Sequence, residues 1–371
     1  MIQLTIVAGA RPNFMKIAPI IHAIQAQNQS REALRYRLVH TGQHYDKKMS
    51  GDFFEQLDIP EPDANLGGGG GSQAEQTASI MVAFEKELLA NRPDLVLVVG
   101  DVTSTLACSI TAKKLGIAVA HVEGGIRSGD MEMPEEINRI VTDSISDYFF
   151  TTTAQADQNL LHSGVPSEKI FMVGNTMIDT LMANRNRFTA PQGKPFDNLE
   201  TKQYFVLTLH RPSNVDHEKQ LGEIISEILH NSKGLPVIFP VHPRTAKTLA
   251  NLELDYPNLH LTEPLPYLEF NYLVANAKGV ITDSGGITEE ASVLDVPCIT
   301  LRNSTERTET ITMGTNELIG TDPKKLKPYL AKIHAGDWKK YQGIPLWDGK
   351  AAQRIVKYLL GIYSNKLSSN L

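Results

Sequence analysis

Acidic and imidazole side chains follow directly after several apolar runs of this chain, where residues that do chemistry are expected in an α/β protein. Asp101 follows the run 94–100, Glu123 follows the run 117–122, and His210 follows the run 204–209. Each run has the length and apolar composition of a buried strand. Because ligands of open α/β sheets bind outside the carboxyl ends of the strands, these side chains are predicted to face one crevice.

A fourth strand end carries a glycine turn that could bind phosphate. The turn 283–286 follows the apolar run 279–282 and precedes a predicted helix. A helix N-terminus offers unpaired N–H groups and a positive dipole end, and glycine lets a diphosphate approach the backbone. A carboxylate about one turn into the helix could accept hydrogen bonds from both ribose hydroxyls. A tight structural turn with a capping serine is the alternative. The candidate nucleotide-binding residues here are Ser284, Gly285, Gly286 and Glu290.

Basic side chains near two other turns could contact a diphosphate. The first turn, 9–12, is a weak relative of the glycine-rich dinucleotide fingerprint and lacks a clear acidic ribose partner, so NAD is not expected. Arg11 and Lys16 are better interpreted as diphosphate contacts, with surface solvation as the alternative, mainly for Lys16. His242 follows the run 236–241 and is a candidate phosphate or base contact, or one half of a satisfied strand-end pair.

One more carboxylate completes a candidate acid–base group. Glu135 stands after Pro134 at the start of a predicted helix, where a carboxylate also stabilises the helix dipole. Clustered carboxylates raise one another's pKa, and such groups can move protons near neutral pH. For each residue alone, a structural hydrogen bond is the alternative. The candidate catalytic residues are Asp101, Glu123, Glu135 and His210.

Composition excludes several classes of protein. The chain has 371 residues, a formal net charge of -6 and no basic block, which argues against general nucleic-acid binding. No apolar run approaches the roughly 20 residues that span a bilayer, and the first residues lack a signal peptide pattern, so the cytoplasm is the expected compartment. No metal-ligand spacing and no serine-hydrolase motif occur. Cys108 and Cys298 fall inside predicted buried elements, so no disulfide is expected.

Apolar strand runs alternate with helical periodicity along the whole chain, which indicates an α/β fold with parallel sheets. A shift to proline and polar residues at 189–202 suggests a boundary, so we expect two Rossmann-like halves, 1–185 and 186–351, with a cleft between them. The five-glycine run 67–71 is either a mobile lid or a plain flexible linker.

Ordered motifs along nearly the whole chain resemble the non-hydrolysing UDP-N-acetylglucosamine 2-epimerase family. The matching segments are Gly9-Ala10-Arg11-Pro12 with Lys16, Gly42-Gln43-His44, Gly100-Asp101, His121 to Arg127, Pro134 to Arg139, Gly174-Asn175-Thr176, Leu209-His210-Arg211, Asp283 to Glu290, and Thr305-Glu306-Arg307.

This resemblance implies a GT-B fold whose last helix, 352–371, packs back on the first domain. It implies reversible C2 epimerisation of UDP-N-acetylglucosamine to UDP-N-acetylmannosamine, by elimination of UDP and its re-addition to a glycal. It also implies a homodimer, a UDP-sugar as the ligand, and no external cofactor or metal. The residues that would bind the substrate are Arg11, Lys16, His242, Ser284, Gly285, Gly286, Glu290 and Arg307, and the catalytic group would be Asp101, Glu123, Glu135 and His210.

The chain departs from the commonest members at two places. The run His210-Arg211-Pro212-Ser213-Asn214 stands where those members have His-Arg-Arg-Glu-Asn, and His44-Tyr45-Asp46 also differs. In bacterial relatives these regions help to bind a second, activating UDP-sugar. We therefore predict kinetics without activation by a second UDP-N-acetylglucosamine.

Other functions remain open at this point. A family branch acting on UDP-2,3-diacetamido-2,3-dideoxy-glucuronic acid carries signatures similar to residues 9–12, 40–44 and 242–245. A hydrolysing epimerase would release UDP and N-acetylmannosamine, and a GT-B glycosyltransferase would need an acceptor. A nucleotide-sugar sensor would bind without turnover, and it would not need the complete acid–base group.

Overall fold

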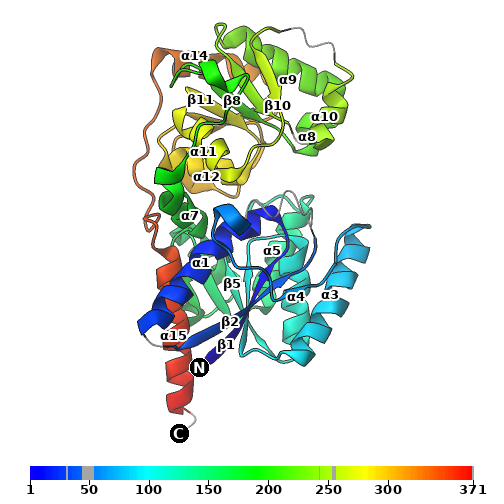
Figure 1. Ribbon diagram of the computed structural model, residues 1–371, viewed down its shortest axis with the longest axis vertical. Helices are drawn as coiled ribbons and strands as arrows, with labels where there is room; N and C mark the ends of the chain where they lie inside the picture. Colours follow the sequence, from blue (N-terminus) through cyan, green and yellow to red (C-terminus); the bar gives the residue numbers. More distant parts are fainter. Residues whose placement is uncertain (31, 44–53, 242, 253–255, 370–371) are drawn as a thin grey trace. The chain divides into compact units, whose positions relative to one another are not determined.

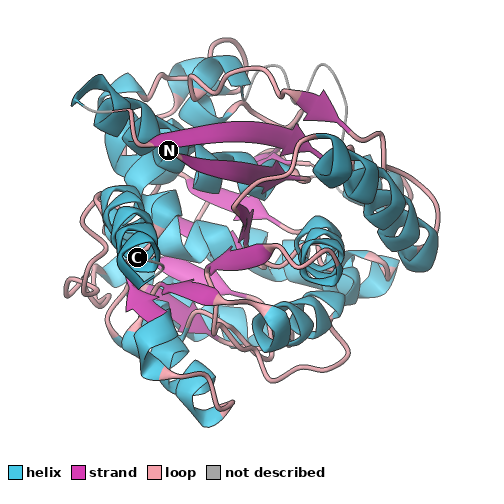
Figure 2. Cartoon of the chain, turned by 90° about the horizontal axis from the view of Figure 1, so that it is seen from below, coloured by secondary structure: helices cyan, strands magenta, loops and turns pink. Residues whose placement is uncertain are grey.

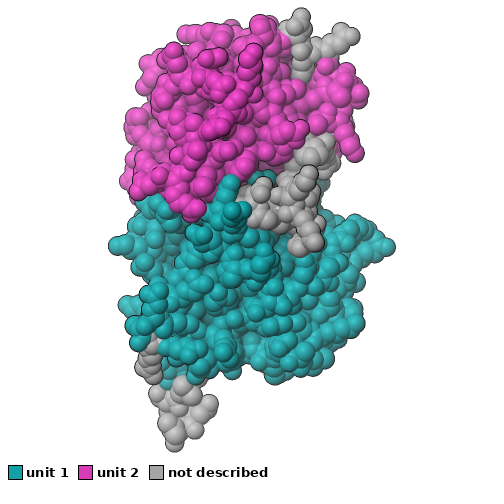
Figure 3. Space-filling model, viewed as in Figure 1, with its two compact units in different colours: residues 1–183, 345–371 teal, residues 184–344 magenta. Residues whose placement is uncertain are grey.

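The computed structural model of the chain describes residues 1–30, 32–43, 54–241, 243–252 and 256–369. The chain divides into two compact units, which Figure 3 shows in different colours. Unit 1 comprises residues 1–183 and 345–371, and unit 2 comprises residues 184–344. The division lies two residues before the expected one at 185/186, and the return to unit 1 begins at residue 345 rather than 352.

Unit 1 is built on a seven-stranded parallel sheet with the order β3-β2-β1-β4-β5-β6-β7. The strands are β1 (Ile2–Ala8), β2 (Leu34–His40), β3 (Ala64–Asn65), β4 (Leu95–Val99), β5 (Ala118–Val122), β6 (Tyr148–Thr151) and β7 (Ile170–Met172). The helices are α1 (Arg11–Ser30), α3 (Gln73–Ala90), α4 (Thr103–Lys114), α5 (Pro134–Ile145), α6 (Ala154–His162), α7 (Thr176–Asn184), which ends at the boundary, and α15 (Ala351–Ser369), with the short 3-10 helix Ser167–Lys169.

Helices cover both faces of this sheet, and this explains its sequence pattern. In Figure 1, α1 and α15 lie along one face while α3, α4 and α5 lie along the other, and Figure 2 shows the helices around the strands from below. Every residue of β4 is buried, so the strand reads as a continuous apolar run rather than as an alternation. Val96 and Val98 belong to one apolar cluster with Phe84 and Leu88 of α3.

Local signals set where the helices of unit 1 begin. Ser72 and Glu75 form a reciprocal capping box at the start of α3, and Pro134 occupies the first turn of α5. The start of α15 is capped from outside: the N–H groups of Ala351 and Ala352 donate to Asp179 at 3.0 and 2.7 Å. Burial, only partly offset by these hydrogen bonds, raises the pKa of Asp179 to about 6.

Unit 2 is built on a six-stranded parallel sheet with the order β10-β9-β8-β11-β12-β13. The strands are β8 (Phe205–Thr208), β9 (Val237–Pro240), β10 (Leu259–Thr262), β11 (Gly279–Thr282), β12 (Cys298–Thr300) and β13 (Asn316–Leu318). The helices are α8 (Pro212–Val215), α9 (Glu218–Asn231), α10 (Pro243–Leu249), α11 (Tyr267–Asn276), α12 (Gly285–Val293), α13 (Thr308–Thr312) and α14 (Leu326–Ala335), with short 3-10 helices Arg185–Arg187, Phe196–Asn198 and Pro323–Lys325.

The sheet of unit 2 is also buried on both faces. Along β8, Phe205 and Leu207 pack into one apolar cluster, whereas Val206, with Tyr204 just before the strand, packs into a second cluster on the other face. The prediction of an α/β protein with two Rossmann-like, GT-B-type halves is therefore confirmed. So is the placement of the two cysteines: Cys108 in α4 and Cys298 in β12 are buried and unbonded to each other.

Candidate functional site

In the parallel sheet of unit 1, successive strands are added on one side of β1 and then, from β4 onward, on its other side. Ligands of doubly wound sheets bind at such a switch point. The side chain of Asn13 connects the carboxyl ends of β1 and β4. The buried Asn13 side chain accepts the N–H groups of Gly9 and Ala10 at 3.0 Å each and donates to the carbonyl of Val99 at 3.2 Å. The turn that carries Arg11 is thus fixed next to the end of β4. Sequence reasoning missed Asn13, whose partners become visible only in the fold.

Lys16 forms a buried ion pair with Glu123. Lys16 Nζ lies 2.5 Å from Glu123 Oε2, and the two side chains are 7% and 3% exposed. The surface alternative for Lys16 is therefore wrong. A Cβ on Gly100, whose φ is +66°, would lie 2.8 Å from Lys16 Nζ, so glycine gives the lysine its space there. Glu123 itself has a left-handed φ of +71°, which is costly for a residue with a side chain.

Asp101 contacts a second buried cation. Its Oδ2 lies 3.2 Å from Nε of Arg139, and its backbone carbonyl accepts Asn138 Nδ2 at 2.8 Å. Arg139 NH1 also contacts Oε2 of Glu136 at 2.5 Å, and both of these side chains are 2% exposed. Asn138 and Arg139 of helix α5 thus hold Asp101 in place, while 30% of the aspartate side chain remains exposed.

The candidate Glu135 lies in the first turn of α5 beside Pro134 and is half-buried. Its neighbour Glu136 points elsewhere, because its carboxylate accepts the N–H groups of Ser128 and Gly129 at 2.9–3.1 Å. Glu135 itself stands where a carboxylate stabilises the helix dipole, and it is half-buried as an acid–base candidate.

A buried charge network stands behind the two acidic turns. His121 is fully buried, with Nδ1 2.7 Å from Asp143 Oδ1 and Nε2 2.8 Å from the carbonyl of Gly100. Asp143 Oδ2 accepts the N–H of Gly125 at 3.0 Å and NH1 of Arg127 at 2.6 Å. Burial alone would raise the pKa of the Asp143 carboxyl, but His121 and Arg127 hold it below its usual value. The network therefore fixes the turns that follow β4 and β5.

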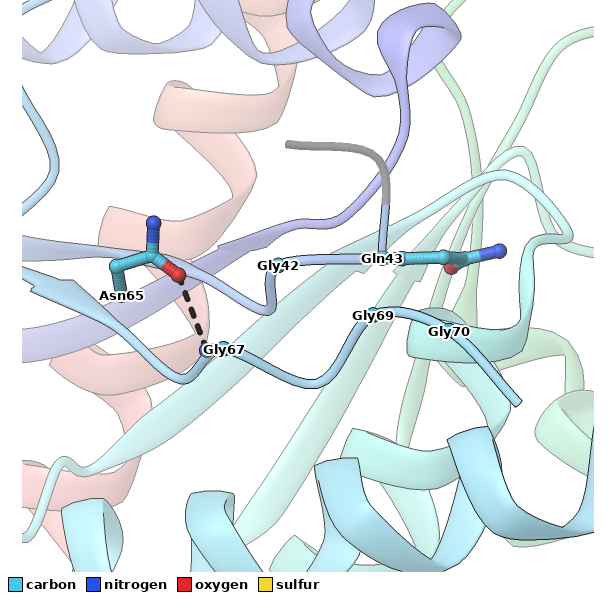
Figure 4. Close-up of a pocket in the computed structure, with 6 residues that line it drawn as sticks. All are labelled: Gly42, Gln43, Asn65, Gly67, Gly69 and Gly70. Carbon is cyan, nitrogen blue, oxygen red and sulfur yellow. Dashed lines mark hydrogen bonds between the residues drawn. The ribbon is translucent and has the colours of Figure 1, made fainter. Parts of the chain in front are cut away.

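The five-glycine run packs closely on the turn after β2. Gly68 donates its N–H to Thr41 O at 2.7 Å, and a Cβ on Gly69 would lie 2.4 Å from Gly42 O. A pocket of about 580 Å³ opens beside this contact, as Figure 4 shows. It is lined by Gly42, Gln43, Asn65, Gly67, Gly69 and Gly70.

Gln43 holds its place through the start of α4, since its Oε1 accepts the N–H and hydroxyl of Ser104 at 3.2 and 2.7 Å. Asn65 Oδ1 accepts the N–H of Gly67 at 3.0 Å, the bond that is dashed in Figure 4. The departures noted at His44, Tyr45 and Asp46 lie outside the described residues.

In unit 2 the strand order reverses between β8 and β11, and His210 and Asp283 meet there. Thr208 pairs with Thr282, so the residues after the two strands are neighbours. Nδ1 of His210 lies 2.7 Å from Oδ1 of Asp283, which is fully buried, whereas 48% of the His210 side chain is exposed. The sequence marked Asp283 as part of the glycine turn but gave no sign of this pairing.

Helix α12 begins at the predicted glycine turn. Ser284 is its N-cap, and the N–H of Ser284 donates to Thr282 Oγ1 at 3.0 Å. A Cβ on Gly285 would lie 2.5 Å from Glu306 Oε1, so a larger residue there would displace the end of that side chain. The backbone at Gly285 and Gly286 is half-buried, which suits a helix N-terminus that receives an anion.

Glu290 lies on the same helix. Only 4% of this residue is exposed, so its carboxyl group is buried. The hydroxyl of Tyr267 donates to its Oε1 at 3.0 Å. Burial, partly offset by hydrogen bonds from Tyr267 and Asn271, raises the pKa of Glu290 to about 7. This carboxyl group can therefore change its charge near neutral pH.

Arg307 is buried and engaged within unit 2. Its Nε lies 3.0 Å from Oε1 of Glu289, which is fully buried. The neighbouring pair Arg302–Glu306 closes at 2.8 Å. The remaining candidate, His242, lies outside the described residues.

The described part of the chain holds no cluster of three or more His, Cys, Asp and Glu residues that could bind a metal ion. Nor does any of its helices have the length and apolarity needed to cross a membrane.

Comparison with known proteins gives consistent matches. The model of the family described as UDP-N-acetylglucosamine 2-epimerase matches residues 26–360. The UDP-N-acetylglucosamine 2-epimerase of Methanocaldococcus jannaschii is 41% identical, covering 96% of this chain and 98% of that protein. The UDP-2,3-diacetamido-2,3-dideoxy-D-glucuronate 2-epimerase of Pseudomonas aeruginosa is 39% identical over 96% and 98%. A crystal structure of the Methanocaldococcus jannaschii UDP-GlcNAc 2-epimerase in complex with UDP-GlcNAc and UDP matches with a TM-score of 0.85 and 40% identity, over 96% of this chain and 99% of that one.

Proposed function

Because this chain belongs to the UDP-N-acetylglucosamine 2-epimerase family, we propose that it interconverts UDP-N-acetylglucosamine and UDP-N-acetylmannosamine without releasing UDP. The observation that carries the proposal is the similarity, over 96% of the chain, to an epimerase whose crystal structure holds UDP-GlcNAc and UDP. The acids that follow β4 and β5, with Glu135 in α5 and the histidine that follows β8, supply the groups that such a reaction needs.

The reaction inverts C2 of the sugar without oxidation or reduction. A base takes the C2 proton, the C1–O bond breaks, and its electron pair leaves with the diphosphate as the C1=C2 bond of a glycal forms. A proton is then delivered to C2 from the other face, and a diphosphate oxygen attacks C1. Atoms and electrons balance, so the scheme calls for no redox cofactor.

In this proposal, unit 2 recognises UDP. The N–H groups at the start of α12, with the Ser284 hydroxyl, bind the diphosphate, because they are oriented in advance toward an anion. The carboxylate of Glu290 accepts the ribose hydroxyls. Arg307 and His242 stay candidates, and the ion pair of Arg307 with Glu289 indicates that it also holds α12 in place.

Unit 1 supplies most of the proton-transfer groups. Asp101 and Glu123 are held by the cations Arg139 and Lys16, and Glu135 lies at the start of α5. Lys16, with Arg11, is also a candidate for stabilising departing UDP, a task in which fixed charges are most effective. His210 of unit 2 completes the group. Several groups are useful because the sugar must lose and gain its proton on opposite faces.

Proton NMR of the purified protein with UDP-N-acetylglucosamine in heavy water tests this proposal. We expect UDP-N-acetylmannosamine that carries deuterium at C2, with no free UDP accumulating. Free N-acetylmannosamine together with UDP would instead show a hydrolysing enzyme. Intact substrate after long incubation would contradict the proposal, and the Pseudomonas aeruginosa relative's named substrate would then be the next one to supply.

We extend the proposal to a homodimer, as the family resemblance implies. Light scattering in solution should give the mass of two chains. A mass of one chain at the concentrations used for activity would contradict this part alone.

A further inference from the structure

We propose that Asp283 is a positioning residue: it holds the imidazole of His210 with Nδ1 protonated and thereby presents Nε2 to the substrate. The inference rests on the proposed function, since it deepens the role of His210 in the epimerisation. It adds to that function a residue whose contacts lie wholly within unit 2.

The position of Asp283 follows from the sheet. β8 and β11 are neighbouring parallel strands in the register Thr208 with Thr282, and the two threonine hydroxyls lie 2.7 Å apart. His210 and Asp283 follow these strands by two residues and one residue. The pair therefore sits at the switch point of the sheet, where ligands bind in doubly wound proteins.

The carboxylate of Asp283 is saturated with donors. It accepts the backbone N–H of His210 at 3.1 Å, the N–H of Arg211 at 2.9 Å and Nδ2 of Asn214 at 3.0 Å, besides the imidazole. Asn214 Nδ2 also donates to Leu301 O at 3.0 Å, which ties the site to the end of β12. The carboxylate therefore fixes both the backbone and the ring of His210.

These contacts determine which form of the ring is stable. Burial alone would raise the pKa of Asp283, but the hydrogen bond and charge of His210, with the donors above, hold it below its usual value. An ionised carboxylate can only accept hydrogen bonds, so the ring nitrogen that faces it carries the proton. In neutral His210 the basic lone pair is then on Nε2, and 48% of this side chain is exposed.

The first test reads the tautomer of the unmodified protein. Long-range proton–nitrogen NMR of 15N-histidine-labelled protein distinguishes the two neutral forms, and His210→Gln assigns the His210 signals by their loss. We expect the Nδ1–H form. An Nε2–H form would overturn the proposal, whether or not the protein epimerises any sugar.

The second test changes the carboxylate. Asp283→Asn keeps the size but can donate to Nδ1, so we expect the Nε2–H form to gain population and kcat to fall about 100-fold or more with KM little changed. Asp179→Asn is the matched control, because that buried aspartate of α7 also accepts two N–H groups but caps the start of α15. It should leave kcat unchanged.

The outcomes separate this inference from the function on which it rests. An unmodified protein that does not epimerise contradicts the proposed function, while its tautomer still decides the inference. An Asp283→Asn protein that keeps the Nδ1–H form and its kcat overturns the inference alone. If that variant does not fold, the tautomer of the unmodified protein decides.

Discussion

Asp101 combines a fixed position with access to a ligand. Its carboxylate lies 3.2 Å from Arg139, a side chain that is 2% exposed and is braced by Glu136, yet 30% of the aspartate side chain is exposed. A carboxylate that is anchored on one side and open on the other is suited to proton transfer. This geometry makes Asp101 the most informative acid to change.

Asp101→Asn should lower the rate of epimerisation by about 100-fold or more, because positioned acid–base groups contribute roughly that much. The amide keeps the size of the side chain but cannot take up a proton at neutral pH. The rate of deuterium incorporation at C2, followed by NMR, measures the effect.

Asp147→Asn is the matched control, at the amino ends of the strands of the same sheet. Asp147 precedes β6, where it contacts Lys113 Nζ at 2.8 Å and accepts the N–H of Val119. We expect its activity to stay within about twofold of the unmodified protein. Full activity in Asp101→Asn would remove Asp101 from the catalytic group.

We predict that the buried carboxyl group of Glu290 lowers the stability of the folded protein above neutral pH but strengthens the binding of the UDP-sugar. Its pKa in the folded protein is about 7, raised mainly by burial, so between about pH 4.5 and 7 the folded state holds a proton that the unfolded state has lost. The free energy of unfolding therefore falls as the pH rises through this window. Glu290→Gln removes this cost, and Gln can donate to Asn271 Oδ1, a buried atom without a hydrogen bond to any described residue.

We expect Glu290→Gln to be more stable than the unmodified protein at pH 8, by at most about 3 kcal/mol, and nearly equal at pH 4.5. Its KM for UDP-N-acetylglucosamine should rise, because an amide accepts the ribose hydroxyls less well than a carboxylate. Urea unfolding at the two pH values and initial rates give these quantities. Glu263→Gln, at an exposed carboxylate, should show neither effect. A variant that loses stability at pH 8 would contradict this account.

At the scale of elements, the sequence predicted the strands that end in candidate residues, because parallel strands covered on both faces are continuous apolar runs. Shorter elements escaped: β3 has two residues and β13 has three, too few for a periodic signal. The partners of the site escaped as well. Asn13, Arg139 and Asp143 lie outside the strand ends, and their polar groups meet those ends only after helices pack on the sheet.

The glycine loop shows what a sequence leaves open even where it is distinctive. A run of glycines predicts a flexible backbone. It does not reveal that Gly68 and Gly69 pack on the turn after β2 (Figure 4). This contact forms the wall of the pocket beside Gln43. The glycine loop is therefore held at Gly68 and Gly69, where its backbone packs on Thr41 and Gly42.

Gly69→Ala should release this loop. The added methyl group would lie 2.4 Å from the carbonyl oxygen of Gly42, and a backbone atom cannot move aside as a flexible side chain can. We expect the amide hydrogen of Gly68, bonded to Thr41 O, to exchange at least about tenfold faster with solvent. Gly361→Ala in α15 is the control, since nothing lies within 4 Å of its added methyl group and its backbone is helical. Equal exchange of the Gly68 amide in both variants would contradict the role of the close contact.

At the scale of the whole molecule, each of the two units has its own sheet with the same kind of switch point. Each has a parallel sheet whose order reverses once, and each places polar side chains after the two strands at the reversal. Unit 1 holds its acids with buried cations, whereas unit 2 holds a histidine with a buried acid. In the proposed reaction unit 1 therefore contributes anchored carboxylates, whereas unit 2 contributes an anchored imidazole together with the start of α12.

The kinetics of the whole molecule should be simple. Activation by a second UDP-sugar needs groups that bind its diphosphate and couple that binding to catalysis. The run Arg-Glu expected from the commonest family members is replaced here by Pro212 and Ser213, which are exposed and uncharged at the start of α8. We therefore expect a hyperbolic dependence of rate on UDP-N-acetylglucosamine, and conversion of pure UDP-N-acetylmannosamine without a lag. Initial rates in both directions measure this. A sigmoidal curve, or a lag that a trace of UDP-N-acetylglucosamine removes, would show that the second site operates without those charges.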